Sequence, residues 1–149
     1  MKEYMPIVAE ILNNSNPSKI LDAPCGNGWL HSTLQYEHTI DGIDLFESAP
    51  AGYSSFMKID LDSGLGGMAN NGYDAIVSCE GIEHLANPGL FLDTAHSCLK
   101  EKGMIIITTP NTWYPGSKLK FFLNGFFPSF PCLVGKINRG SHMHIMPWS

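Results

Sequence analysis

The chain has 149 residues, of which 44% are hydrophobic, so it can bury one substantial core and is too short for two ordinary domains. Its formal net charge of −5 offers no broad attraction to a phosphate backbone, which argues against a nucleic-acid partner. The four cysteines form no CxxC pair and no apolar run reaches the roughly 20 residues that span a bilayer, so we expect a soluble, cytoplasmic protein with reduced thiols.

The first half of the chain alternates predicted helix and strand. Apolar side chains at helical spacing predict an N-terminal helix that ends in the polar run 13–17, with the stripe Tyr4, Ile7, Val8, Ile11 and Leu12. A strand over 19–22 enters a turn over 23–28, and residues 29–34 suit a short helix. Two further strands are predicted over 38–45 and 56–61, each with an aspartate near its end.

The second half repeats this alternation as far as Pro110. Residues 63–72 are rich in glycine and asparagine and predict a loop, and the nearly continuous apolar run 73–79 is typical of the central strand of a parallel sheet. Asn87 and Pro88 begin a predicted helix whose buried stripe is Phe91, Leu92, Ala95, Cys98 and Leu99. A fifth strand is expected over 104–109.

This order predicts an α/β fold, namely a Rossmann-like, doubly wound, mostly parallel sheet in three layers. In such sheets the ligand lies outside the carboxyl ends of the strands. The residues 20–28 place small side chains where the first strand gives way to a turn, so a ligand can approach the backbone closely. Asp44 and Asp60 end the next two strands, where carboxylates can accept hydrogen bonds from a ribose and from an adenine amino group. Taken singly, the glycine turn is equally explained by the conformational needs of a tight turn, and a strand-end aspartate is more often a solvated turn residue.

Two longer segments carry a resemblance to a known family. Leu21–Gly28 resembles the first motif of class I S-adenosylmethionine-dependent methyltransferases, and Tyr73–Pro88 resembles their fourth-strand signature, with small-molecule enzymes of the ubiquinone-biosynthesis and polysaccharide-cluster type as the nearest pattern. The resemblance implies S-adenosyl-L-methionine as the cofactor. It departs at Ala23 and Pro24, where many members have a glycine pair.

The resemblance also implies roles for individual residues. The methionine part of the cofactor would lie against Asp22, Ala23, Pro24, Cys25, Gly26 and Gly28. Asp44, with Leu45 beside it, would hold the ribose, Asp60 and Leu61 the adenine, and Cys79 and Glu80 would border the methyl group.

Methyl transfer from a sulfonium is an in-line displacement, so alignment supplies much of the rate enhancement. For a hydroxyl acceptor a base helps to remove the proton, and His84 is the first candidate, with His142 and His144 as second candidates. An alternative role for His84 is to organise its loop together with Glu83. The expected acceptor is a small molecule, a sugar or a lipid-linked compound, and no metal is expected.

Three alternatives remain open from the sequence. A nicotinamide dehydrogenase shares this fold, but His31 stands where its fingerprint requires a third glycine or alanine. A metal hydrolase would have to gather Glu80, Glu83, His84, His142 and His144. A catalytically incomplete cofactor-binding fragment is also possible, because the family fold continues past the fifth strand into a helix and an antiparallel strand pair, and the residues 111–149 include Pro115, Pro128, Pro131 and Pro147. We therefore expect that the C-terminal part of the usual fold is truncated.

The segment Leu119–Phe130 is unusually aromatic. Leu119, Phe122, Leu123 and Phe126 recur at helical spacing, which predicts a helix packed on the sheet. Phe121, Phe127 and Phe130 would remain for a lid over the acceptor pocket or for a peripheral membrane contact. An exposed edge strand of an incomplete sheet would also allow a homodimer.

Overall fold

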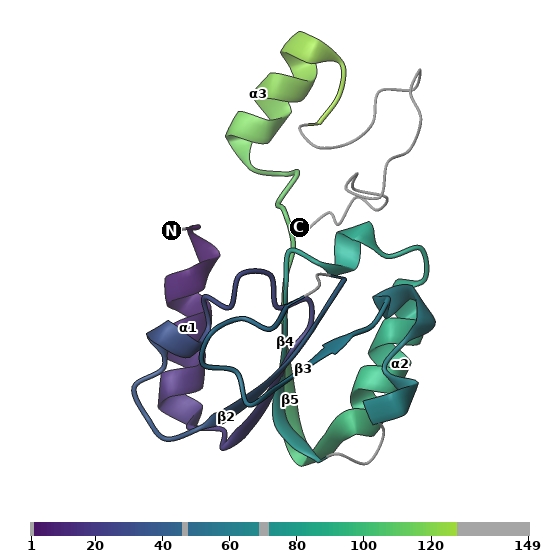
Figure 1. Cartoon of the computed structure of the whole chain (residues 1–149). Helices are drawn as coiled ribbons and strands as arrows, with labels where there is room; N and C mark the ends of the chain where they lie inside the picture. The colour runs from purple at the N-terminus through teal and green to yellow at the C-terminus, as the bar shows by residue number, and fades with distance from the viewer. Residues whose placement is uncertain (1, 46–47, 69–71, 128–149) are drawn as a thin grey trace.

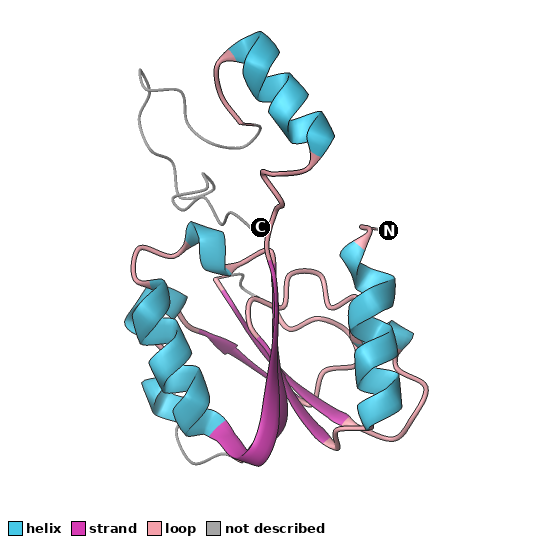
Figure 2. Cartoon of the chain, turned by 180° about the vertical axis from the view of Figure 1, so that it is seen from behind, coloured by secondary structure: helices cyan, strands magenta, loops and turns pink. Residues whose placement is uncertain are grey.

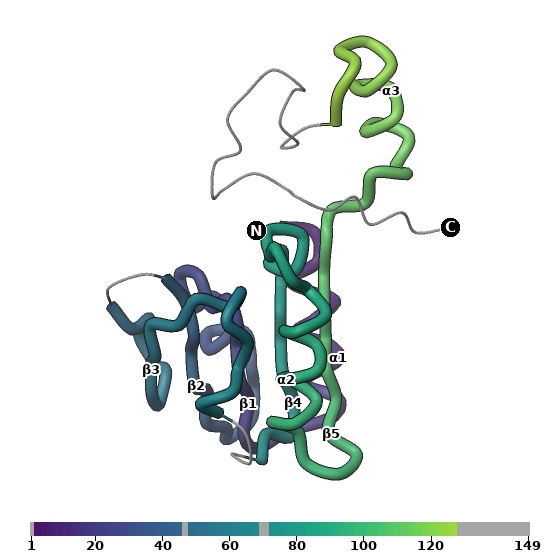
Figure 3. The backbone as a smooth tube through the Cα atoms, turned by 90° about the vertical axis from the view of Figure 1, so that its right-hand side faces the viewer, coloured from purple at the N-terminus to yellow at the C-terminus, as the bar shows by residue number. Residues whose placement is uncertain are grey.

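The computed structural model describes residues 2–45, 48–68 and 72–127. Five parallel strands form one sheet in the order β3-β2-β1-β4-β5, which Figure 3 shows from the side. The strands are β1 (Lys19–Asp22), β2 (Thr39–Asp44), β3 (Ser55–Lys58), β4 (Tyr73–Cys79) and β5 (Leu99–Thr108). Helices α1 (Tyr4–Ser15) and α2 (Pro88–Cys98) cover opposite faces of the sheet (Figure 1 and Figure 2). The predicted three-layer, doubly wound α/β fold is therefore confirmed.

The register places β1 in the middle of the sheet. Asp22, its last residue, is paired with Gly42 of β2 on one side and Val77 of β4 on the other. The prediction that 73–79 is the central strand is thus wrong by one position. Both strands are covered on both faces, so the apolar pattern does not tell which of the two is central. Strand β1 is also short and contains only three buried residues.

The core divides into two clusters because successive strand residues point to opposite faces. Leu21, Ile43 and Ile76 pack toward α2 with Phe91, whereas Val8 and Leu12 of α1 belong to the cluster on the other face. Of the stripe predicted for α1, Ile7 and Ile11 are exposed, at 60% and 40%. The buried stripe is therefore narrower than predicted and consists of Val8, Ala9 and Leu12.

Helix α2 begins and ends as its sequence signals require. Asn87 Oδ1 accepts a hydrogen bond from the Leu90 amide at 3.1 Å, and Pro88 occupies the first turn. Phe91 is buried, but Leu92 is 39% exposed, so its place in the predicted stripe is wrong. The helix turns directly into β5 at Leu99, five residues before the predicted start, because Tyr73 of β4 already pairs with Leu99.

Three further element boundaries differ from the sequence prediction. The helix expected over 29–34 is reduced to the 3-10 turn His31–Thr33, where the Thr33 hydroxyl donates to the Leu30 carbonyl at 2.8 Å. Strand β3 stops at Lys58 because Asp60 instead caps the 3-10 turn Leu61–Ser63. The loop predicted over 63–72 contains the 3-10 turn Gly66–Met68.

Helix α3 (Pro115–Asn124) lies beyond the carboxyl end of β5 and away from the sheet (Figure 1). None of its residues is buried, and Phe122 is 84% exposed. The prediction that this helix packs on the sheet is therefore wrong. A loop from Thr109 to Tyr114 directs the helix away from the sheet, and helical spacing alone does not say what an apolar face contacts. No helix in the described part of the chain has the length and apolar character to span a bilayer.

The packing of α2 gives a direct test of this core. Replacing the fully buried Phe91 by alanine removes a large side chain from the centre of one cluster, so Phe91→Ala should lower the free energy of unfolding by about 3–5 kcal/mol in urea denaturation. Leu92→Ala is the matched control on the exposed side of the same helix and should cost less than about 1 kcal/mol. Equal losses for the two variants would contradict the observed orientation of α2.

Candidate functional site

The site predicted from the sequence lies where β1, β2 and β4 end. The strand order reverses direction around β1, since the chain proceeds to β2 and β3 on one side of it and to β4 and β5 on the other. Such a switch point leaves a crevice at the carboxyl ends of the strands, where ligands of open α/β sheets bind. Asp22, Asp44 and Cys79 are the last residues of three of these strands and are all buried there. We call this edge of the sheet the carboxyl edge.

Backbone hydrogen bonds to both neighbouring strands fix the start of the turn after β1. The Ala23 amide donates to the Val77 carbonyl of β4, and the Cys25 amide donates to the Ile43 carbonyl of β2, both at 2.9 Å. Gly26 then adopts a φ of +53°, a left-handed conformation that favours glycine. A Cβ built on Gly26 would meet no atom of the described residues within 4 Å, so these residues leave the space beside this backbone open to a ligand.

Asp44 is fixed by this turn. Its Oδ2 accepts a hydrogen bond from the Gly26 amide at 2.8 Å, and its Oδ1 accepts one from the Leu45 amide at 2.7 Å. Each carboxylate oxygen can accept a further hydrogen bond, so the oriented carboxylate can still receive hydroxyl groups. The glycine turn and the end of the second strand, which the sequence analysis assigns to one ligand, are therefore in direct contact.

Asp22 is fully buried beside this pair. Its Oδ2 accepts a hydrogen bond from the Tyr53 hydroxyl, and its Oδ1 accepts none among the described residues. The pKa of Asp22 is raised to about 7, chiefly by burial; the Tyr53 hydrogen bond opposes this rise, and the nearby Asp44 adds a smaller contribution to it. This carboxyl group can therefore change its charge near neutral pH.

The segment after β4 contributes a second acidic group of residues. The Glu80 amide donates to the Thr108 carbonyl at 3.0 Å, and the Glu80 carboxylate lies 4.0 Å from Lys2 Nζ of the N-terminal segment. Glu83 is buried, with its Oε1 4.0 Å from His84 Nε2. Burial raises the pKa of both Glu80 and Glu83. The structure thus places the predicted His84 against Glu83, which is compatible with either role proposed for that histidine.

Asp60 and Leu61 lie at the same edge after β3. Asp60 is exposed and its Oδ1 accepts from the Asp62 amide at 3.1 Å, while Leu61 is buried. Asp62 in turn accepts from the Ala86 amide at 2.6 Å, which ties this segment to the loop after β4. Leu45 is 46% exposed at the end of β2. The candidate binding residues of all four strands therefore belong to one edge of the sheet.

Two tyrosines at this edge were missed by the sequence analysis. Burial raises the pKa of Tyr4 to about 12, with smaller contributions from Cys79 and Glu80, so its hydroxyl is close to the end of β4. Its ring meets Trp29 edge to face with centroids 6.1 Å apart. Tyr53 comes from the β2–β3 connection. No spacing rule identifies which loop or helix end reaches over a sheet, although the glycine and proline near Tyr53 indicate a tight turn.

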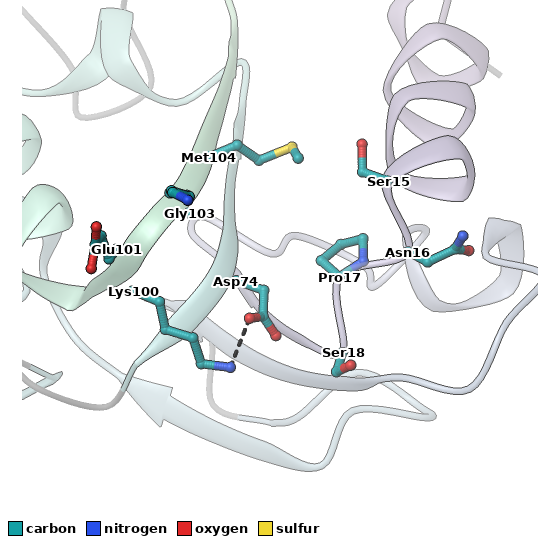
Figure 4. A pocket seen from close by; sticks show the side chains of 10 residues that line it. Ser15, Asn16, Pro17, Ser18, Asp74, Lys100, Glu101, Gly103 and Met104 are labelled. Carbon is teal, nitrogen blue, oxygen red and sulfur yellow. Dashed lines mark hydrogen bonds and ion pairs between the residues drawn. The ribbon is translucent and has the colours of Figure 1, made fainter.

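Two cavities border the described part of the sheet at opposite ends. One, of about 530 Å³, lies beside the glycine turn and is lined by Lys2, Met5, Asn27, Trp29, Ser32 and Thr33. The other, of about 240 Å³, is shown in Figure 4 at the amino ends of the strands. There Lys100 Nζ lies 2.7 Å from Asp74 Oδ1, and this hydrogen bond lowers the pKa of Asp74. That second cavity is remote from the carboxyl edge, and its ion pair fastens the start of β4 to the start of β5.

No group of three or more potential metal-ligating side chains occurs within residues 2–45, 48–68 and 72–127. His142 and His144, which the metal-hydrolase alternative requires, lie outside the described residues, as do Phe130 and the last three prolines.

A sequence profile described as a methyltransferase domain matches residues 2–143. The chain belongs to this methyltransferase domain family. The resemblance drawn from the first and fourth strands is therefore confirmed at the level of the family. A comparison with curated proteins finds no significant match.

Solved structures agree on the fold. A 1,6-didemethyltoxoflavin-N1-methyltransferase from Burkholderia thailandensis, with bound 1,6-didemethyltoxoflavin and S-adenosylhomocysteine, is similar with a TM-score of 0.57 and 23% identity over 70% of this chain and 51% of its own. A SAM-dependent methyltransferase from Archaeoglobus fulgidus has a TM-score of 0.59 and 21% identity over 81% of this chain and 60% of its own. A further one from Mesorhizobium loti has a TM-score of 0.53 and 20% identity over 66% of this chain and 49% of its own. The chain spans about half the length of the first of these structures.

The burial of Asp22 predicts a pH-dependent stability. Its pKa in the folded chain, about 7, lies above the ordinary value of 3.8, so the folded state holds the proton more tightly than the unfolded state. The resulting stabilisation is complete below about pH 4 and is lost as the pH rises to about 7. Urea titrations should therefore show wild type losing about 3 kcal/mol relative to Asp22→Asn between pH 4 and pH 7.

The control for this measurement is Asp93→Asn on the exposed surface of α2, which should not diverge from wild type with pH. A constant difference between wild type and Asp22→Asn from pH 4 to pH 7 would contradict the burial of this carboxyl group.

Proposed function

We propose that this chain binds S-adenosyl-L-methionine along the carboxyl edge and takes part in methyl transfer to a small-molecule acceptor. The observation that carries the proposal is the hydrogen bond between the Gly26 amide and Asp44, with open space beside Gly26. This arrangement sets an oriented carboxylate next to backbone that a ligand can approach, which is what a nucleoside with a charged tail requires. The buried Asp22 Oδ1, which accepts no hydrogen bond from the described residues, fits a cationic donor such as the cofactor's ammonium group.

Different residues of the carboxyl edge would bind different parts of the cofactor. Asp44 would accept the ribose hydroxyls, with Leu45 beside it, and Asp60 and Leu61 would border the adenine. The turn from Asp22 to Gly28 would carry the methionine part, and Cys79 and Glu80 would border the methyl group. Within the turn, Gly28 faces Pro50 and Tyr53 of the same chain, so Gly26 offers the more open backbone.

The proposed chemistry asks little of individual side chains. When bound, S-adenosylmethionine supplies a methyl group on a sulfonium, and alignment with the acceptor accounts for much of the rate. His84 would remove the proton of a hydroxyl acceptor, and the buried Glu83, whose Oε1 lies 4.0 Å from His84 Nε2, would orient the imidazole. The Glu80 carboxylate and Lys2 Nζ, which lie 4.0 Å apart, would border the carboxyl edge on the side of α1.

Ligand titration tests the proposal. By calorimetry we expect binding of S-adenosylmethionine and little binding of NAD, since the fingerprint of nicotinamide enzymes is incomplete at His31. Asp44→Ala should weaken S-adenosylmethionine at least tenfold, because the ribose hydroxyls lose their acceptor. Asp93→Ala, far from the edge on α2, is the control and should bind as wild type does. Unchanged affinity in Asp44→Ala would remove the site assignment.

The acceptor class is proposed from α3 to be amphipathic or lipid-linked. The helix and its approaches expose large apolar side chains, namely Trp113, Tyr114, Leu119, Phe121, Phe122, Leu123 and Phe126. Lys118 and Lys120 lie among them, and the segment 109–127 contains no acidic residue although the whole chain is acidic. An apolar surface with positive charge suits an anionic amphiphile or the surface of an anionic membrane. Phe121 stacks on Phe127 at 4.6 Å, which leaves Phe122 and Leu123 as the outermost apolar groups.

Cosedimentation with vesicles containing one third phosphatidylserine tests this surface. We expect the double variant Phe122→Ser, Leu123→Ser to lose at least five-fold in vesicle binding, since both side chains are more than two thirds exposed. A control double variant at Ile7→Ser and Ile11→Ser, on the exposed side of α1, should leave binding unchanged. Equal binding of all three proteins would contradict a lipid role for α3.

A further inference from the structure

The ring of Tyr53 packs against two glycines, Gly28 and Gly42, at the carboxyl edge. A Cβ on Gly42 of β2 would lie only 2.8 Å from the Tyr53 ring and 3.1 Å from Cys25 Sγ, and a Cβ on Gly28 would lie 2.2 Å from Pro50 and 3.1 Å from the Tyr53 ring. At Gly42 the ring therefore fills space that almost any side chain would take, and at Gly28 it shares that space with Pro50. Gly42 has no left-handed backbone conformation to explain its glycine, so the ring is the steric reason for a small residue there.

This position of the ring brings the Tyr53 hydroxyl within hydrogen-bond distance of Asp22. The hydroxyl donates to Oδ2 of the fully buried carboxyl group, while Oδ1 has no partner among the described residues. A buried carboxylate with one satisfied oxygen is oriented but incomplete, because its second oxygen retains the cost of desolvation. A cationic hydrogen-bond donor compensates for that cost more fully than a neutral one does.

We infer that Tyr53 is a positioning residue, which holds Asp22 as an oriented carboxylate for the α-ammonium group of the cofactor's methionine part. The inference rests on the proposed function and adds to it the β2–β3 connection, which carries Tyr53 and which the motifs of the first and fourth strands do not include. Through this contact the connection sets how strongly the amino-acid end of the cofactor is held, while Asp44 serves the nucleoside end.

The charge of Asp22 is governed by the groups that face it. These are Tyr53 from the β2–β3 connection, Asp44 of β2, Cys25 of the turn, Cys79 of β4 and Tyr4 of α1. Burial raises the pKa of both cysteine thiols to about 12, so they remain neutral near pH 7. Of these groups, the Tyr53 hydroxyl is the one whose hydrogen bond lowers the pKa of Asp22. Its removal would shift the ionisation of Asp22 to higher pH.

The test compares two nucleosides that differ in the amino-acid tail. S-adenosylhomocysteine carries the ammonium group, and 5′-methylthioadenosine lacks the whole tail. For wild type, calorimetry from pH 6 to pH 8 should show S-adenosylhomocysteine gaining about tenfold in affinity as Asp22 ionises, and 5′-methylthioadenosine staying constant. Tyr53→Phe should weaken S-adenosylhomocysteine about five- to tenfold at pH 7, move its pH midpoint upward, and leave 5′-methylthioadenosine unchanged.

Two further variants separate positioning from general stability. Tyr36→Phe also removes a buried hydroxyl, but one that lies before β2 at the far end of the sheet, so both ligands should bind as they do to wild type. Gly42→Ala keeps the Tyr53 hydroxyl and displaces its ring, so it should weaken S-adenosylhomocysteine in the same direction as Tyr53→Phe. Thermal melting identifies any variant that fails to fold.

The outcomes distinguish the inference from the proposed function. An equal loss of both ligands in Tyr53→Phe, or an unshifted pH profile for S-adenosylhomocysteine, would overturn the positioning role while leaving cofactor binding intact. If wild type binds neither nucleoside, the proposed function fails, and the inference fails with it.

Discussion

Two carboxylates buried at the ends of adjacent parallel strands are the constraint on which this site depends. Asp22 and Asp44 end β1 and β2, and the pKa of the fully buried Asp22 is raised by its burial and by the nearby Asp44. The Gly26 amide of the glycine turn donates a hydrogen bond to Asp44, and the Tyr53 hydroxyl donates one to a single oxygen of Asp22. The carboxylate oxygens at this edge can therefore accept more hydrogen bonds than the sheet and its connections donate to them. A ligand with hydroxyl groups and a positive charge is complementary to such an edge.

The connection between β1 and β2 contains less helix than the sequence pattern suggested. The helix predicted over 29–34 is reduced to the 3-10 turn His31–Thr33, and β2 reaches β3 through the connection that carries Pro50 and Tyr53. Pro50 and Tyr53 pack on Gly28, which joins the two connections on the side of the sheet covered by α1. The short connections thus bring a tyrosine to the first-strand aspartate.

The elements with continuous signals were predictable from the sequence. The burial of β4, the Asn87 and Pro88 cap of α2 and the end of α1 near Asn16 follow from local rules on apolar pattern and capping. The placement of the glycine turn and Asp44 at one edge also follows, because parallel topology brings these strand ends together, whereas the hydrogen bond between the Gly26 amide and Asp44 was not predicted. The role of Tyr53 and the placement of Tyr4 could not be predicted, since each depends on how a connection or helix end folds over the sheet. The position of α3 was missed for a related reason, because an apolar helical face does not specify its partner.

The central claim is that a nucleoside lies across the ends of β1, β2 and β3 with its ribose at Asp44. A crystal structure of the chain with S-adenosylhomocysteine tests this most directly. The account predicts ribose hydroxyls within hydrogen-bond distance of the Asp44 carboxylate and the amino-acid tail beside Asp22 and Gly26. A nucleoside bound at the amino ends of the strands, or one whose ribose makes no contact with Asp44, would contradict it.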